Sequence, residues 1–585
     1  MTIQAIHQYH NAIHKIYQFS GQSHEQAIKD EFKRLLNHYC DSRNLLVVSE
    51  INIKNKRGDL IRPDGIIKNN LRLDCGYWES KANVNLEKEI LAKINVGYPL
   101  SNTLFQDDKT AILYQNNQRF LEIPLENERE LDQLLTQFVS YESQEIKEFN
   151  AAIEQFKQDL PHILEALRGM IAVQEKSNPA FISARANFLT VCQHSINPAI
   201  TPSDINEMLL QHILTEEIFT SIFSDSQFHR ENNIAKELYN VENTFFSGTT
   251  KRNTLAGIQG YYAVIKANSA AIADHHDKQF FLKSIYENFY KAYNPKAADR
   301  LGIVYTPREI VKFQIETVDL LLEKHFSKSL ADEGVKILDP CTGTGTYLCD
   351  LIDYLPRHRL AHKYAHDIYA NELGLLPYYI ANLNIEYTYQ QKMNEYVEFN
   401  HICWMDTLDN ASENFTGSNN DLFGLSIENT ARIKQQNAAK ISVILGNPPY
   451  NANQQNENDN NKNREYPAID KRIKETYIDK STAQKTKVYD MYARFLRWAS
   501  DRLQDNGMIS FIINRSFIDS RTFDGFRKSL AEEFDFVYIV DTQSDVRKNP
   551  KLSGTKHNVF GIQTGVAVLF LVKKSGEKSW LVESN

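Results

Sequence analysis

The chain has 585 residues, of which 42% are hydrophobic and 24% are charged, and its formal net charge is −8. This length predicts three or four domains, because single cores rarely grow beyond about 250–300 residues. No apolar run approaches the roughly 18 residues of a membrane-spanning helix, so we expect a globular protein with no membrane partner. The acidic balance excludes a nonspecific, histone-like DNA binder, although a local basic face can still bind phosphates.

The cysteines and the N-terminus indicate the compartment. Six cysteines, at positions 40, 75, 192, 341, 349 and 403, include no CxxC pair. This spacing predicts neither a disulfide framework nor a zinc site and fits a reducing environment. The first residues lack a continuous apolar stretch, so a secretory signal is not expected. We therefore expect a cytoplasmic protein.

The pattern predicts an α/β domain over residues 1–140 and a helical connector over 141–299. Long helical periodicities with few β-branched runs dominate the connector. In the first domain the expected elements are a helix at 27–39, extended segments at 45–53, 65–78 and 110–114, and a charged helix at 86–95.

From residue 300 to 585, apolar strands alternate with helical stretches. The strands are VKILDP, HDIYANE, ISVILGNPP, GMISFII and GVAVLFLV. Such alternation predicts a mostly parallel, Rossmann-like sheet with helices on both faces. A polar insert at 451–490 interrupts it, and seven of the thirteen residues at 451–463 are Asn, which predicts a loop.

A glycine loop follows the first of these strands. The run DPCTGTG at residues 339–345 precedes a helix, and such a unit brings backbone N–H groups against a ligand. Glycines permit that approach because a Cβ would block it. Glu372 ends the next strand and can accept hydrogen bonds from both ribose hydroxyls of a nucleoside cofactor. The alternatives are a tight turn and an exposed Glu.

Another strand ends at the tetrapeptide Asn447-Pro448-Pro449-Tyr450. The prolines make this loop rigid, and the loop lies at the strand's carboxyl end, where ligands bind. The Asn447 carbonyl and a proline carbonyl can accept hydrogen bonds from a planar amine, while Tyr450 stacks on the ring that carries it. A structural turn is the alternative, but the spacing of about 100 residues from the glycine loop disfavours it.

Near the N-terminus, Asp64, Glu79 and Lys81 form a PD…ExK pattern. Glu79 and Lys81 are two apart, so on a strand they share a face. The two carboxylates could hold Mg2+ while Lys81 orients a water for phosphodiester attack. The isolated pattern often arises by chance. Further candidates for this site are Glu31, Asp74 (as a rival to Asp64) and Gln115.

Residues 302–574 resemble amino-methylating DNA methyltransferases of the γ arrangement, in which the cofactor motifs precede the catalytic motif. The resemblance implies S-adenosylmethionine as cofactor and adenine N6 in double-stranded DNA as the methylated atom, with the base flipped out of the duplex. It also implies that residues 489–492 begin a helix lining the same pocket. The implied cofactor-binding residues are Tyr305, Thr306 and Pro307 at the methionine moiety, Asp339, Gly343 and Gly345 in the glycine loop, Glu372 at the ribose and Asp406 at the cofactor adenine.

Three alternatives remain open. Cytosine N4 fits the same hydrogen-bond acceptors. The same tetrapeptide also occurs in enzymes that methylate a glutamine amide of release factors, which resemble this chain less because they are roughly half as long and lack its flanking domains. A third possibility is a non-enzymatic fragment that binds cofactor and DNA without turnover.

The segment from GYWESK at residue 76 to Gln115 closely resembles the nuclease domain of type ISP restriction–modification enzymes, and the insert and part of the connector resemble them too. This resemblance implies a PD-(D/E)xK-like nuclease that uses Mg2+. Two departures set further expectations. No GxxxxGK[ST] loop occurs, so we expect no ATP. The chain stops about ten residues after the last methyltransferase strand, so we expect the target-recognition domain to be missing and a separate specificity polypeptide to supply it.

Overall fold

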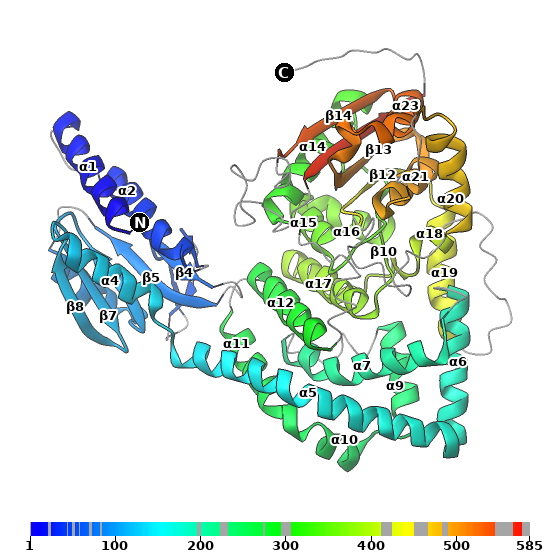
Figure 1. Cartoon of the computed structure of the whole chain (residues 1–585), viewed down its shortest axis with the longest axis horizontal. Helices are drawn as coiled ribbons and strands as arrows, with labels where there is room; N and C mark the ends of the chain where they lie inside the picture. The colour runs from blue at the N-terminus through cyan, green and yellow to red at the C-terminus, as the bar shows by residue number, and fades with distance from the viewer. Residues whose placement is uncertain are drawn as a thin grey trace. The chain divides into compact units, whose positions relative to one another are not determined.

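The computed structural model describes residues 2–20, 25–43, 45–49, 53–55, 57, 59–69, 73–81, 85–195, 200–222, 232–272, 275–293, 306–410, 424–449, 466–482, 489–543 and 565–575. The chain divides into two compact units. Figure 1 shows the helices and strands of both, coloured from the N-terminus to the C-terminus. The first comprises Met1–Pro161, Ser221–Ser224 and Leu255–Ile285, and the second comprises His162–Thr220, Asp225–Thr254 and Tyr286–Asn585.

The first unit contains a six-stranded sheet in the order β1-β4-β5-β6-β7-β8, in which only β5 and β6 are parallel neighbours. A parallel pair needs a crossover, and helix α3 supplies it. The strands are β1 (Leu46–Val48), β4 (Gly65–Lys68), β5 (Asp74–Ser80), β6 (Asn102–Gln106), β7 (Thr110–Gln115) and β8 (Gln118–Pro124), with a separate pair, β2 (Ile53–Lys54) and β3 (Leu60–Ile61).

Helices cover both faces of this sheet, because strand residues alternate between them. Trp78 and Leu104 belong to a core shared with α1, α2 and α4, whereas Tyr77 and Phe105 pack with residues of α3. These helices are α1 (Thr2–Ser20), α2 (Glu25–Asp41), α3 (Leu86–Asn95) and α4 (Glu128–Ser140). The structure confirms the predicted helices at 27–39 and 86–95 and the extended segment at 110–114. The segment predicted as one stretch at 65–78 is instead the antiparallel pair β4 and β5, and the segment predicted at 45–53 contains β1 and the first residue of β2, with residues 50–52 outside the described ranges. Elements α1, α4, β3, β6 and β8 were not predicted.

The connector is helical in its described residues, as predicted. Its helices are α5 (Gln144–Ser177), α6 (Pro179–Ser195), α7 (Pro202–Ile222), α9 (Asn233–Glu242), α10 (Gly248–Thr254), η1 (Ala256–Ile258), α11 (Gln259–Ala271) and α12 (His275–Tyr293). Helices α5 and α12 each contribute to both units. The division into domains at 1–140, 141–299 and 300–585 stays a prediction.

The second unit contains a seven-stranded sheet in the order β11-β10-β9-β12-β13-β15-β14. Only β15 runs antiparallel to its neighbours, which confirms the mostly parallel α/β prediction. Strands β11 and β14 were not predicted. The strands are β9 (Ile337–Asp339), β10 (Ile368–Glu372), β11 (Ile402–Trp404), β12 (Ile441–Gly446), β13 (Leu503–Asn514), β14 (Phe536–Asp541) and β15 (Val566–Lys573).

Side chains along β13 point alternately to the two faces of the sheet, and helices pack against both faces. Ile509 and Phe511 belong to a core with α20, α21 and α23, whereas Ser510 accepts hydrogen bonds from Gln314 of α14 on the other face. The helices are α14 (Arg308–Phe326), α15 (Thr346–Tyr354), α16 (Arg357–His366), α17 (Leu375–Met393), α18 (Thr407–Asn410), α19 (Gly424–Ala438), α20 (Pro467–Ile473), η2 (Lys474–Ile478), α21 (Met491–Arg502), α22 (Ser516–Asp519), η3 (Arg521–Phe523) and α23 (Asp524–Glu533). Helix α20 and η2 lie within the predicted insert, whose Asn-rich part lies outside the described residues.

Connector helices also pack against this unit's α/β core. The Asn232 side chain, at the start of α9, donates to the Asn382 side-chain oxygen of α17 at 2.8 Å, and the Tyr378 hydroxyl donates to Asn233 at 3.0 Å. The ring of Phe188 in α6 is stacked on the ring of Trp404. Among the helices described, none is long and apolar enough to cross a membrane. All six cysteines are free thiols.

Candidate active sites

Four predicted site residues meet at one edge of the second unit's sheet. Strand β9 pairs in parallel with β10 and β12, and β10 pairs in parallel with β11, so all four strands end at the same edge. The residues at or just beyond these ends are Asp339, Glu372, Asp406 and Asn447. Parallel topology thus brings together residues that are far apart in the sequence.

The glycine loop has the conformation expected of a ligand-binding turn. Gly343 and Gly345 have φ values of 59° and 89°, in the left-handed region that favours glycine. A Cβ on Gly345 would lie 3.2 Å from Cα of Ala381 in α17, so this residue also permits close helix packing. The Gly343 N–H donates to Oε2 of Glu372 at 2.8 Å, which joins the loop to the end of β10.

Two buried carboxyl groups lie beside this loop. Burial raises the pKa of Asp339 to about 8, against an opposing hydrogen bond from the Cys341 N–H. Burial also raises the pKa of Glu372 to about 7, against hydrogen bonds from Gly374 and Gly343. Oδ2 of Asp339 is buried and has no hydrogen-bond partner among the described residues. A ligand that brings a hydrogen-bond donor or a positive charge to this oxygen would favour the ionised form of the carboxyl.

The Asn447 side chain has a defined partner. Its Nδ2 donates to Oγ1 of Thr306 at 2.8 Å, and Thr306 is itself buried. Thr306 precedes Pro307, the N-cap residue of α14. Gly446 leaves room at this point, because a Cβ there would lie 2.9 Å from Oδ1 of Asp339. The sequence placed Thr306 with the cofactor, and its bond to Asn447 was not foreseen, because no local spacing links residues 141 positions apart.

Asp406 is held by residues from two directions. Its Oδ1 accepts from the Leu408 N–H at 3.1 Å, and its Oδ2 accepts from the Tyr466 hydroxyl at 3.1 Å. Tyr466 belongs to the stretch predicted only as an insert, and its contact with Asp406 was not predicted. Asp490, within the predicted lining segment at 489–492, is the N-cap residue of α21. Tyr305 and Tyr450 lie outside the described residues.

In the first unit, Asp64 and Glu79 come together where β4 begins and β5 ends. Oδ2 of Asp64 accepts from the Ser80 N–H at 2.9 Å, because the two strands are antiparallel neighbours. The Lys81 N–H donates to the Gln106 carbonyl at 2.8 Å, so Lys81 directly continues the strand. The three residues of the predicted pattern are therefore close in the fold.

Basic residues already contact both carboxylates. Lys29 lies 2.6 Å from Oδ1 of Asp64, and Lys93 lies 2.8 Å from Oε1 of Glu79. The Tyr98 hydroxyl donates to the same Glu79 oxygen at 2.6 Å. These three residues are not among the predicted site residues, since helix α2, helix α3 and the loop after α3 supply them.

The two carboxyl groups are shifted in opposite directions. Burial raises the pKa of Asp64, but Lys29, the Ser80 N–H and Lys81 together hold it below its ordinary value. Burial raises the pKa of Glu79 above its ordinary value, against Lys93 and Tyr98. Asp64 therefore carries the more stable negative charge of the two.

The further candidates contact residues other than Asp64, Glu79 and Lys81. Asp74 lies at the other end of β5, where it pairs with Lys68 at 2.7 Å. The Gln115 side chain donates to Asn102 at the far end of β6. Glu31 pairs with Arg34. Within the described ranges, no group of three or more His, Cys, Asp or Glu residues is arranged to hold a metal ion.

Two family models match the chain. Residues 152–277 match the coupler domain of type ISP restriction–modification enzymes, and residues 277–540 match the N-6 DNA Methylase family. The chain contains a type ISP coupler domain joined to an N6-adenine DNA methylase domain. The methylase match includes the whole edge formed by β9 to β12. No match was found among curated proteins.

Solved structures extend the likeness beyond these two domains. A DrdV–DNA complex is 47% identical over 98% of this chain and 56% of its own, with a TM-score of 0.73. A nuclease-deletion mutant of the type ISP enzyme LlaGI, with a DNA substrate mimic, is 32% identical over 77% of this chain and 36% of its own, with a TM-score of 0.65. LlaBIII, an ATP-dependent type ISP enzyme bound to DNA, is 30% identical over 83% and 32%, with a TM-score of 0.66. The chain thus spans about half of DrdV and about a third of the other two.

These relatives correct two expectations about partners. The expectation of no ATP is wrong. The coupler domain matches type ISP enzymes, and LlaBIII, a type ISP enzyme, is ATP-dependent. A missing phosphate loop within this chain could not decide the matter, since the chain matches only 32% of LlaBIII. The expectation of a separate specificity polypeptide is wrong as well, because in these DNA-bound relatives the matched region belongs to one longer chain.

The buried carboxyl groups predict how stability depends on pH. Because the pKa values of Asp339 and Glu372 are raised on folding, the folded protein retains protons that the unfolded chain releases. Their contribution to stability is full below about pH 4 and is lost as pH rises to about 8. We expect the free energy of unfolding in urea to fall from pH 7 to pH 8. Asp339→Asn should weaken this dependence, whereas the exposed control Glu309→Gln should keep it. An unchanged slope in Asp339→Asn would contradict this cause.

Proposed function

We propose that the methylase domain transfers a methyl group from S-adenosylmethionine to adenine N6 in double-stranded DNA, as part of a cytoplasmic restriction–modification enzyme. The observation that carries this proposal is the single edge at which β9, β10, β11 and β12 place the glycine loop, Glu372, Asp406 and Asn447. The matched methylase family and the DNA-bound relatives support the same substrate.

The residues at this edge fit the cofactor. The left-handed Gly343 leaves open space where a side chain would stand, and Oδ2 of Asp339 is a buried carboxyl oxygen without a described partner. Glu372 can accept from ribose hydroxyls through the lone pairs left by Gly343 and Gly374. The cofactor supplies an electrophilic methyl group on a positively charged sulfur. The buried acids beside it would favour that charge once they are ionised.

Asn447 is proposed to orient the amine of a flipped base. Because Nδ2 of Asn447 donates to Thr306, its Oδ1 is directed to accept a hydrogen from the amine, and the Pro448 carbonyl accepts the other. S-adenosylmethionine held at Asp339 and Glu372 would supply the methyl group, with the new N–C bond replacing its S–C bond. The extra proton on nitrogen passes to water. Stacking of the base on Tyr450 stays part of the proposal.

Replacing Asn447 tests this proposal directly. Asn447→Ala should lower tritium transfer to DNA by about 100-fold or more, since it removes an acceptor that acts on the reacting nitrogen. The exposed control Asn240→Ala should transfer normally. Equal transfer by Asn447→Ala and the wild type would refute the role. Label in protein would favour a glutamine amide, and cofactor binding without any transfer would favour a non-enzymatic fragment. Long-read sequencing of methylated DNA separates adenine N6 from cytosine N4.

Thr306 is proposed as a positioning residue that fixes which way the Asn447 amide points. Thr306→Val keeps the shape but removes the acceptor, so we expect kcat to fall about 10–100-fold with KM for the cofactor within about twofold. Thr306→Ser should restore most of kcat, because it keeps the hydroxyl. If Thr306 only contacts the cofactor, KM will rise instead while kcat stays unchanged.

We further propose a Mg2+-dependent endonuclease site at Asp64, Glu79 and Lys81. The supporting observation is that Asp64 accepts from the Ser80 N–H, which places it beside the Glu79–Lys81 strand end. The two carboxylates would hold the ion and Lys81 would orient the attacking water. Because Lys93 contacts Glu79, binding of the ion requires that this ammonium group move aside.

This endonuclease site predicts a selective loss. Lys81→Ala should abolish Mg2+-dependent nicking of plasmid DNA, because the attacking water loses its orienting group. Cofactor binding, measured by calorimetry, should stay unchanged. Lys88→Ala, on the exposed side of α3, is the matched control and should nick normally. Loss of nicking and cofactor binding together would argue against two independent sites.

A further inference from the structure

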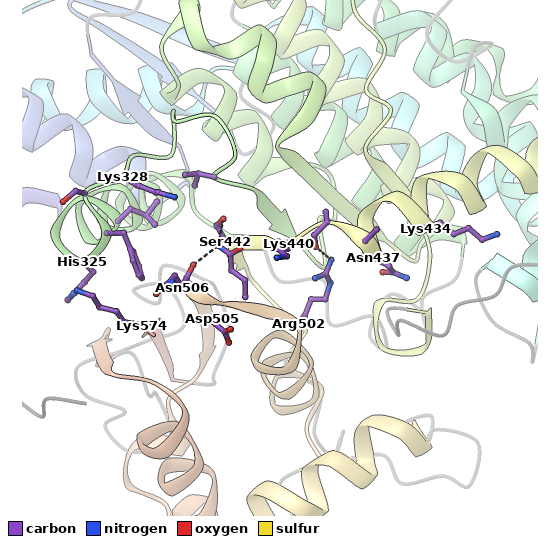
Figure 2. Close-up of a pocket in the computed structure, with 17 residues that line it drawn as sticks. His325, Lys328, Lys434, Asn437, Lys440, Ser442, Arg502, Asp505, Asn506 and Lys574 are labelled. Carbon is purple, nitrogen blue, oxygen red and sulfur yellow. Dashed lines mark hydrogen bonds between the residues drawn. The ribbon is translucent and has the colours of Figure 1, made fainter. Parts of the chain in front are cut away.

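A concave site lies in the methylase domain, away from the sheet edge that holds Asp339 and Asn447. It is a cavity of about 1110 Å³. Its walls come from the C-terminal ends of α14 and α19, the beginnings of β12 and β13, and the residue after β15. Figure 2 shows His325, Lys328 and Lys574 on the left of this cavity and Lys434 on the right, with Lys440 and Arg502 between them.

The cavity is separated from the methyl-transfer edge by the length of a strand. Ser442, near the start of β12, lines the cavity, whereas Asn447 follows the end of the same strand. Five residues of extended chain span about 16 Å. A ligand in the cavity therefore cannot act as part of the cofactor or amine site.

The charge of the lining contrasts with that of the whole chain. Four lysines and one arginine line the cavity, against one carboxylate, Asp505, while the chain has a net charge of −8. Asp505 is 88% exposed and lies 3.8 Å from Lys573. Among the described residues, no carboxylate forms an ion pair with any of the four lysines, which are Lys328, Lys434, Lys440 and Lys574.

Helix ends explain only part of this positive charge. The C-termini of α14, α19 and α21 converge here, and each carries about half a negative charge. Arg502 neutralises one of these helix ends, since it donates to the Gln436 and Ala439 carbonyls at the end of α19. Three helix ends together offset about one and a half positive charges, which leaves most of the lysine charge available to a ligand.

The cavity is too large and too mixed in character for a simple inorganic ion. Leu322, Phe326, Val335 and Ala438 give it an apolar part beside the lysines. Its volume is that of sites that take small organic ligands. We propose that this cavity binds a free nucleotide, with its phosphates on the lysines and its base and sugar against the apolar residues. Lysine binds phosphate as a point charge, which suits a rim of separate ammonium groups.

His325 offers a reporter within the cavity. Burial, followed by the charges of Lys324 and Lys574, lowers the pKa of its imidazole. The ring also lies 3.0 Å from the Tyr538 hydroxyl and packs against Phe536. Phosphates beside Lys574 would offset the positive charge, so a bound nucleotide should raise this pKa, and NMR can follow the imidazole signals.

The test is calorimetric titration of ATP, ADP and inorganic phosphate into the full chain saturated with S-adenosylhomocysteine, which keeps adenosine groups out of the methyl-donor site. We expect one site for ATP and ADP and at least tenfold weaker binding of phosphate. The double variant Lys328→Glu with Lys440→Glu changes two exposed lysines of the lining and should weaken ATP binding at least tenfold. Lys528→Glu, an exposed lysine of α23, is the control and should stay within twofold.

Retained S-adenosylhomocysteine binding by the double variant will show that the domain is folded. If this variant does not fold, the single variants Lys328→Ala and Lys440→Ala should each weaken ATP binding by about threefold or more. Absence of ATP binding to the wild type, or equal binding by wild type and charge-changed variants, overturns the proposal. A 20-base-pair duplex is the competing arm. If the lysine changes weaken duplex binding while ATP does not bind, the lysines serve the DNA backbone and the nucleotide site is refuted.

Discussion

The shared direction of β9, β10, β11 and β12 is the constraint on which the methylase domain depends. Parallel neighbours must be joined by crossovers, so each strand returns through helices that cover a face of the sheet. Every strand then delivers its last residue to the same edge. If β12 ran in the opposite direction, Asn447 would lie about 16 Å from the glycine loop, and no side-chain adjustment could restore contact.

The two edges of this sheet differ in electrostatic character. One holds the buried acids Asp339 and Glu372, whose raised pKa values reflect the cost of placing charge where water is excluded. The other gathers exposed lysines around a cavity. A cationic sulfur suits the first edge and a phosphate suits the second, so the net charge of the chain describes neither.

In the first unit, an antiparallel pair of strands brings the candidate site residues together, as parallel strands do in the second unit. Asp64 and Glu79 meet because β4 and β5 are neighbours in register, and both carboxylates are already neutralised in part by lysines from helices α2 and α3. Asp74 could not take the place of Asp64, since it begins the strand that Glu79 nearly ends. The choice between the two acids depended on strand register, which spacing alone does not reveal.

The sequence by itself determined the class of fold and most of the candidate residues. Alternating strands and helices, the glycine run and Asn447-Pro448-Pro449 are local patterns, because each arises from the backbone preferences of adjacent residues. Only the tertiary structure decided the partners of these residues. The bond between Thr306 and Asn447, the contact of Tyr466 with Asp406 and the lysine-lined cavity join segments far apart in the chain. Such contacts follow from strand order and helix packing, which no local spacing encodes.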